Sequence, residues 1–97
     1  MENLDSMAMA QRRKRIVFRS WHRGTRETDL ILGRFADAAI NEFSELELAE
    51  FERILDMPDP DIFAWVTGIE PVPSHADTAL FTRLIAFHDK NSALPDA

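Results

Sequence analysis

The sequence predicts an all-α fold, a single domain formed by a small bundle of about five short helices. Apolar residues recur at the three- and four-residue spacing of amphipathic helices, and most of these runs follow a residue that commonly begins a helix. No window shows the sustained alternation of a strand or the turn of a hairpin. The chain of 97 residues is long enough to bury one hydrophobic core.

The helical domain is expected to span residues 11–90. Residues 1–10 are expected to form a flexible N-terminus, and residues 91–97 a flexible C-terminal tail. The first helix opens the domain, because Val17 and Trp21 lie four positions apart there on an otherwise basic surface.

The second and third helices are expected to begin after hydroxyl residues that cap helices well. Thr25 is a favourable N-cap, and Glu27 lies in the first turn after it, where the helix dipole favours an acid. Ser44 and Glu47 match the S-x-x-E pattern of a capping box. Apolar residues at helical spacing follow both caps: Leu32, Phe35, Ala39 and Phe43 in one helix, and Leu48, Phe51 and Leu55 in the other.

The fourth helix is expected to be short, with Asp59 as its N-cap, Pro60 at its first position and Gly68 at its C-terminus. A proline-punctuated loop follows. Ser74 and Asp77 then give a second S-x-x-[DE] start, which predicts a fifth helix. The inner stripe of that helix is expected to comprise Leu80, Phe81, Leu84, Ile85 and His88.

Charge is unevenly distributed along the chain. Residues 1–34 hold eight basic side chains against four acidic ones, whereas residues 35–97 hold three against thirteen, which gives the net charge of −6. The densest basic run is Arg12–Arg15. It can be interpreted as a contact for nucleic acid or as a solvated helix face that complements the acidic body. No nucleic-acid partner is expected, because the net negative charge repels phosphates.

Several classes of protein are disfavoured by the sequence. There is no apolar run long enough to span a membrane, and the N-terminus has neither the basic and apolar regions of a secretory signal nor the acid-poor composition of a transit peptide. The chain has no cysteine, and its three histidines lack metal-binding spacing. It also lacks a glycine-rich phosphate loop and a nucleophile with an orienting base. We expect a cytoplasmic protein without a membrane partner, a metal, a cofactor or catalytic residues of its own.

The stretch "WHRGTRETD" contains the residues most in need of explanation. If the first helix ends near His22 and Thr25 caps the second, Gly24 forms the turn between them, where it can take a positive φ or allow a close approach. Arg23 then lies at a helix C-terminus and Glu27 at a helix N-terminus, each favoured by the dipole there. Both are expected on one exposed corner. The residues alone leave open whether this corner is only a joint or a binding surface.

A resemblance to a known family bears on that choice. "RGTRE" at Arg23–Glu27 fits the R-G-x-x-E motif of the succinate dehydrogenase assembly factors that promote covalent FAD attachment. The sequence E-x-D-L-I-L-x-R-F overlaps and follows it, and D-P-D-x-F-x-W lies downstream at Asp59–Trp65. The similarity extends from about Arg15 to about His88. Members occur in bacteria and mitochondria, and the missing transit peptide favours the bacterial form.

The resemblance implies a non-catalytic chaperone that binds the flavoprotein subunit of succinate dehydrogenase, and sometimes that of fumarate reductase. FAD would belong to this client, whose own histidine forms the covalent bond, while the assembly factor contributes positioning and electrostatics. The protein is expected to be a monomer when free. The alternative from the residues themselves is a nucleic-acid-associated regulator, or a general protein-interaction module, that uses the basic first helix.

The resemblance also assigns the client-binding residues. Arg23 and Glu27 occupy the charged positions of the motif and would pair with client groups near the flavin, and Gly24 would permit their close approach. Trp21, Arg26 and Asp29 are expected at the rim of this contact. Asp59 and Pro60 are expected to shape the fourth helix rather than to touch the client.

Overall fold

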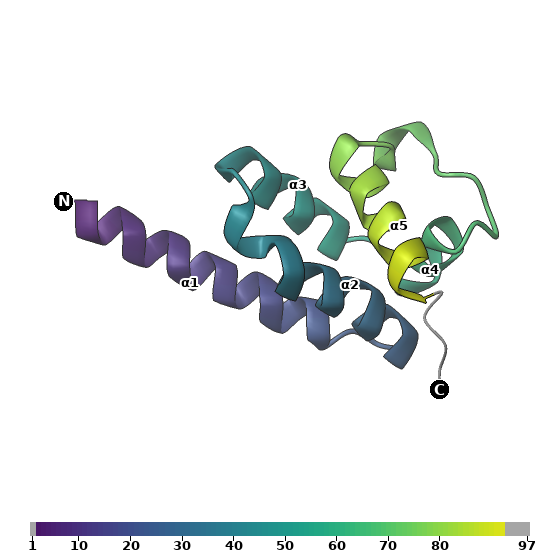
Figure 1. Ribbon diagram of the computed structural model, residues 1–97, viewed down its shortest axis with the longest axis horizontal. Coiled ribbons are helices and arrows are strands. Elements are labelled where there is room, and N and C mark those ends of the chain that lie inside the picture. Colours follow the sequence, from purple (N-terminus) through teal and green to yellow (C-terminus); the bar gives the residue numbers. More distant parts are fainter. Residues whose placement is uncertain (1, 93–97) are drawn as a thin grey trace.

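The computed structural model describes residues 2–92, which form five α-helices and two short 3-10 turns and contain no strand (Figure 1). The predicted all-α bundle is therefore confirmed. The elements in order are α1 (Glu2–Trp21), α2 (Arg26–Ala39), η1 (Ile40–Glu42), α3 (Glu45–Leu55), α4 (Asp59–Val66), η2 (Ser74–Ala76) and α5 (Ala79–Ser92).

The longest helix, α1, lies beside α2, which runs back along it in the opposite direction (Figure 1). The first half of α1 projects beyond the rest of the bundle. α3 packs against the second half of α1 and against α5, and α4 lies against α2 and α5 near the turn that follows α1. Among the described residues, no helix combines the length and the apolar character needed to cross a bilayer.

The core contains apolar side chains from all five helices. Phe35, Phe43 and Phe51 form an aromatic cluster in which each ring centroid lies 5.8 Å from the other two. These rings are almost completely buried, as are Leu48 and Phe81. Truncation of a buried phenylalanine to alanine typically costs about 3–5 kcal/mol, so this cluster contributes strongly to stability.

The first helix differs from the prediction in its start and in its buried face. It begins at Glu2, so the segment 1–10, expected to be flexible, is helical from Glu2 onward, and it contains no glycine or proline that would interrupt a helix. Where burial is described on α1, from Ser6 onward, the fully buried residues are Ile16 and Ser20, whereas Val17 is half-buried. Ile16 follows a run of basic residues, and two of them, Arg12 and Arg13, reach across to other parts of the fold. The basic run made this side of the helix look solvated in the sequence, although it faces the core.

Two of the expected helix starts are confirmed. The side chain of Thr25 accepts a hydrogen bond of 3.2 Å from the amide of Thr28 at the start of α2. Ser44 and Glu47 form the predicted capping box, with distances of 3.1 Å and 2.8 Å for its two reciprocal bonds. Gly68 ends α4 with a positive φ of 83°, as expected for a C-terminal glycine.

The other two caps differ from the prediction. Pro58 is the N-cap of α4, and Asp59 is its first helical residue, because the Asp59 carboxylate is bonded to another part of the chain. Ser74 begins the separate turn η2. The cap of α5 is Thr78, whose hydroxyl accepts a 3.1 Å bond from the amide of Phe81. α5 continues to Ser92, and the remainder of the expected flexible tail, 93–97, lies outside the described residues.

Candidate functional site

The turn between α1 and α2 lies where the sequence placed it. α1 ends at Trp21, Thr25 caps α2, and Gly24 lies between them. The backbone amide of Arg23 donates a hydrogen bond of 2.6 Å to the Oδ1 atom of Asp29, which ties the turn to the first turn of α2. This hydrogen bond holds the turn through residues of the turn and of α2 alone, without a contact from α3, α4 or α5.

The guanidinium of Arg23 is directed into the protein. Its Nε donates to Asp59 Oδ1 over 2.8 Å, its Nη1 to the carbonyl of Leu55 over 2.6 Å and its Nη2 to the carbonyl of Met57 over 2.9 Å. Only 11% of the side chain is exposed. Arg23 thus satisfies carbonyls at the C-terminus of α3, where a cation is favourable, and also neutralises the carboxylate that begins α4.

Gly24 allows a close approach and does not have an unusual backbone angle. Its amide donates a 2.6 Å hydrogen bond to Asp59 Oδ2, and a Cβ atom at this position would lie 3.1 Å from the same oxygen. Among the described residues only Gly68 has a positive φ. The Asp59 carboxylate therefore holds both Arg23 and Gly24, one through each oxygen, and we call these three residues the Asp59 clamp.

Glu27 is exposed, and its carboxylate makes no side-chain hydrogen bond within the described part of the chain. The prediction that Arg23 and Glu27 share one exposed corner is wrong for Arg23, because the α3 carbonyls and Asp59 offer its guanidinium three acceptors inside the protein. Arg26 is exposed like Glu27. Of the two charged positions of R-G-x-x-E, Arg23 is bonded within the fold, whereas Glu27 is exposed.

Two shallow, mainly apolar hollows flank Glu27, and both are also lined by Phe63 of α4. One has a volume of about 340 Å³ and lies toward Thr25 and Pro60. The other, of about 210 Å³, lies toward α5 and is lined on that side by Phe87. The carboxylate of Glu27 therefore stands between two small recesses that could receive apolar side chains of a partner.

Trp21 and Asp29, expected at the rim of the contact, both have partners within the fold. The indole of Trp21 covers Gly33 of α2 so closely that a Cβ there would overlap its ring atoms. Its Nε1 donates a 3.2 Å hydrogen bond to Asp37. Asp29 accepts the bond from Arg23 described above. Whether their remaining surface also contacts a client stays a prediction.

Sequence reasoning missed Asp59 as part of this site. The D-P-D sequence was read as a helix cap, and an acid that precedes proline gives no sign that it will pair with an arginine 36 positions earlier. Gly33 was also missed, although a glycine inside an amphipathic helix often marks close packing of a large side chain.

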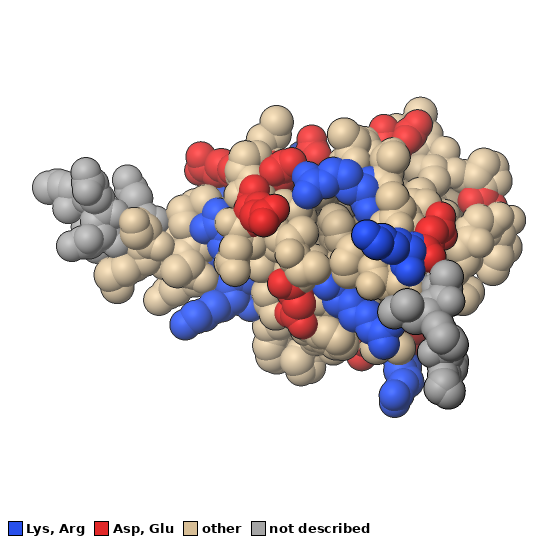
Figure 2. All heavy atoms as spheres, in the orientation of Figure 1, with Lys and Arg blue, Asp and Glu red and all other residues tan. Residues whose placement is uncertain are grey.

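The basic run Arg12–Arg15 is divided by the fold. Arg12 donates to both carboxylate oxygens of Glu52, over 2.8 Å and 3.1 Å, and this bonding holds the pKa of Glu52 below its ordinary value. Arg13 donates to the carbonyls of Ile40 and Phe43. The face of the molecule in Figure 2 accordingly shows basic and acidic side chains interspersed. The run is therefore not a uniformly solvated face: half of it is bound to α3 and η1.

Comparison with known proteins places this chain in a family. Residues 14–88 match the family model described as "Flavinator of succinate dehydrogenase", which is most of the chain and includes the whole Asp59 clamp. The chain belongs to this family. The resemblance inferred from the R-G-x-x-E and D-P-D-x-F-x-W motifs is thereby confirmed.

Relatives of known name support the same assignment. The chain is 40% identical over 77 residues to the FAD assembly factor SdhE of Acetobacter pasteurianus, an alignment that covers 79% of this chain and 71% of that protein. It is 38% identical to succinate dehydrogenase assembly factor 2, mitochondrial, of Scheffersomyces stipitis, over 86% of this chain and 58% of the relative. The corresponding protein of Dictyostelium discoideum is also 38% identical, in an alignment that covers 84% of this chain and 57% of that protein. The chain thus spans little more than half of these mitochondrial relatives.

Proposed function

We propose that this protein binds the flavoprotein subunit of succinate dehydrogenase and promotes covalent attachment of FAD to that subunit. The observation that carries the proposal is the family match over residues 14–88, within which hydrogen bonds to α2, α3 and α4 hold the R-G-x-x-E turn. The names of the relatives supply succinate dehydrogenase and FAD, and the choice of the flavoprotein subunit as client is part of the proposal. The flavoprotein subunit of fumarate reductase is a second candidate client.

Within this proposal the motif residues have different tasks. Arg23 and Gly24 build the turn through the Asp59 clamp, and Glu27, exposed on the first turn of α2, is the group that pairs with the client. Arg26, next to it and also exposed, lies at the rim. A rigid turn presents the Glu27 carboxylate in one geometry and so reduces the entropy lost on binding.

FAD is assigned to the client and not to this chain. The hollows beside the motif are small, and the carboxylates of Glu27 and Asp59 line the larger of them. Asp59 is neutralised by Arg23, but the exposed Glu27 carboxylate repels a pyrophosphate, and this supports assigning FAD to the client. The contribution of this protein is to hold the client in a conformation that favours bond formation, with no covalent role for its own side chains.

The experiment combines the purified flavoprotein subunit, free FAD and this protein, and reads covalent flavin by in-gel fluorescence after denaturation. We expect a one-to-one complex on size-exclusion chromatography and faster appearance of covalent flavin when the protein is present. Equal rates with and without it, in the absence of any complex, would contradict the proposal.

A further inference from the structure

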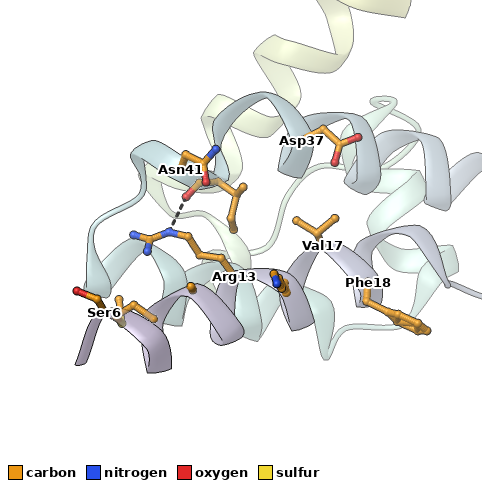
Figure 3. Close-up of a pocket in the computed structure, with 10 residues that line it drawn as sticks. Ser6, Arg13, Val17, Phe18, Asp37 and Asn41 are labelled. Carbon is orange, nitrogen blue, oxygen red and sulfur yellow. Dashed lines mark hydrogen bonds between the residues drawn. The ribbon is translucent and has the colours of Figure 1, made fainter. Parts of the chain in front are cut away.

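A groove along α1 lies apart from the Glu27 corner. It runs between α1 and the α2–η1 segment, has a volume of about 940 Å³ and is lined by apolar side chains that include Met9, Val17 and Ile40 (Figure 3). Figure 3 shows Val17 between the two helices, with Asp37 of α2 across from it. The groove extends along α1 from Ser6 to Phe18, whereas Glu27 lies past the C-terminal end of this helix, on the first turn of α2.

Exposed apolar side chains continue the groove over the outer face of α1. Met7 is 57% exposed and Phe18 is 56% exposed, and the two lie eleven positions apart, close to three helical turns, so they share one face. The ring of Phe18 stacks on His22 at 3.8 Å between centroids, with 9° between the planes. This stacking holds the Phe18 ring on the helix surface, at the edge of the groove that it also lines.

Unpaired cations border this apolar face. Arg12 and Arg13 are bound to other parts of the fold, but Lys14 and Arg15 are exposed and make no side-chain hydrogen bond among the described residues. Lys14 and Phe18 line both the groove and a second hollow of about 370 Å³, which Arg15 also lines. The surface therefore combines apolar recesses with two free positive charges at its edge.

We propose that this face of α1, which we call the α1 groove, is a second docking surface that binds an acidic amphipathic helix of a protein partner. The apolar side of such a helix would lie in the groove beside Val17, and its carboxylates would pair with Lys14 and Arg15. Helix binding in an apolar groove is a common mode of recognition, and complementary charges set its orientation.

Nucleic acid fits this surface less well. Binding to phosphates needs several free cations, yet two of the four residues in the basic run are bonded within the fold. An apolar floor adds little to recognition of a phosphate backbone, whereas it can bury the apolar side of a helix. These observations favour a carboxylate-bearing apolar helix over a polyphosphate.

The test measures fluorescence anisotropy of a labelled synthetic peptide of about four helical turns, with leucines on one face and glutamates beside them. We expect saturable binding to the wild-type chain. The double substitution Lys14→Glu and Arg15→Glu, and separately Phe18→Ala, should each weaken it by about tenfold or more. Arg53→Glu with Lys90→Glu, at exposed positions outside the groove, makes the same change in net charge and should bind the peptide as wild type does.

Several outcomes would overturn the proposal. The first is that the wild-type chain shows no saturable binding of the peptide. The second is that both charge-reversed proteins lose peptide affinity equally. The third is that the chain binds duplex DNA or phosphatidylglycerol vesicles more tightly than it binds the peptide. Self-association that is lost with Lys14→Glu and Arg15→Glu would show a second copy of the chain to be the occupant and would overturn it equally. Glu27→Gln should leave peptide binding unchanged, which separates this surface from the proposed flavoprotein contact.

Discussion

The Nε atom of Arg23 lies 2.8 Å from Oδ1 of Asp59, and the other oxygen of that carboxylate accepts the amide of Gly24 at 2.6 Å. One side chain at the start of α4 therefore holds both leading residues of the R-G-x-x-E motif. The contact joins segments 36 positions apart and is only 11% and 13% exposed on its two sides. The Arg-Gly pair of this motif is thus part of the internal structure of the bundle.

Arg23→Ala should destabilise the protein by about 2–4 kcal/mol, because it leaves the Asp59 carboxylate and two carbonyls without their donor. Chemical unfolding followed by circular dichroism measures this loss. The matched control is Arg19→Ala, which removes an exposed 2.8 Å pair with Asp56 and should cost less than about 1 kcal/mol. Equal costs for the two substitutions would show that the Asp59 clamp contributes no more than a surface ion pair.

Gly33→Ala should destabilise the protein by about 1–3 kcal/mol, since the new methyl group would overlap the Trp21 ring. In a Trp21→Ala background the same substitution should become neutral or stabilising, because alanine is the better helix former by about 1 kcal/mol. A double-mutant cycle measured by urea unfolding reads this change of sign. A cost of Gly33→Ala that is the same in both backgrounds would contradict the observed packing.

The Arg12–Glu52 pair should make stability depend on acidity in a defined direction. The pKa of Glu52 is lowered in the folded state from its ordinary value of 4.5, chiefly by the hydrogen bond from Arg12. The pair therefore stabilises the fold at a pH above 4.5, and this stabilisation is lost as the pH falls through the lowered pKa of the folded state. Glu52→Gln should therefore lower the melting temperature at about pH 7, and the difference from wild type should shrink toward about pH 3.

Glu50→Gln, on the same helix and without a side-chain hydrogen bond in the described residues, is the control for this measurement. At neutral pH, the melting temperature of Glu50→Gln should differ less from that of wild type than the melting temperature of Glu52→Gln does. If the difference between wild type and Glu52→Gln stayed constant from neutral to acidic pH, the pair would not be the source of the dependence.

The helices could be predicted because their signals are local. The caps at Thr25 and Ser44 and the apolar stripe of α3 involve residues within a few positions of each other, and they were confirmed. The stripe expected for the second helix was confirmed only in part: Leu32 and Phe35 are buried on α2, but α2 ends at Ala39, and Phe43 reaches the core from beyond the turn η1. The start of α1 was missed because residues 2–10 include good helix formers but carry no long apolar stripe of helical spacing. Without such a stripe, the sequence does not distinguish a helix from a flexible segment.

The site could be predicted only in part. The motif and the turn at Gly24 were located correctly, but the direction of the Arg23 side chain depends on where α3 ends and α4 begins. That long-range arrangement has no local signature. The expectation for Asp59 as an N-cap failed for the same reason: its carboxylate is used across the fold, and local capping rules do not include such competition.

The central claim is that the motif divides into Arg23 and Gly24, which hold the turn, and Glu27, which meets the client. The measurement that tests it most directly is covalent flavin on the flavoprotein subunit, read by in-gel fluorescence, in the presence of Glu27→Gln. This variant should unfold within about 0.5 kcal/mol of wild type, because Glu27 is exposed and unbonded among the described residues, yet it should strongly slow flavin attachment. Glu70→Gln, another exposed carboxylate, serves as the control and should act as wild type does. Wild-type covalent flavin with a folded Glu27→Gln protein would contradict the account.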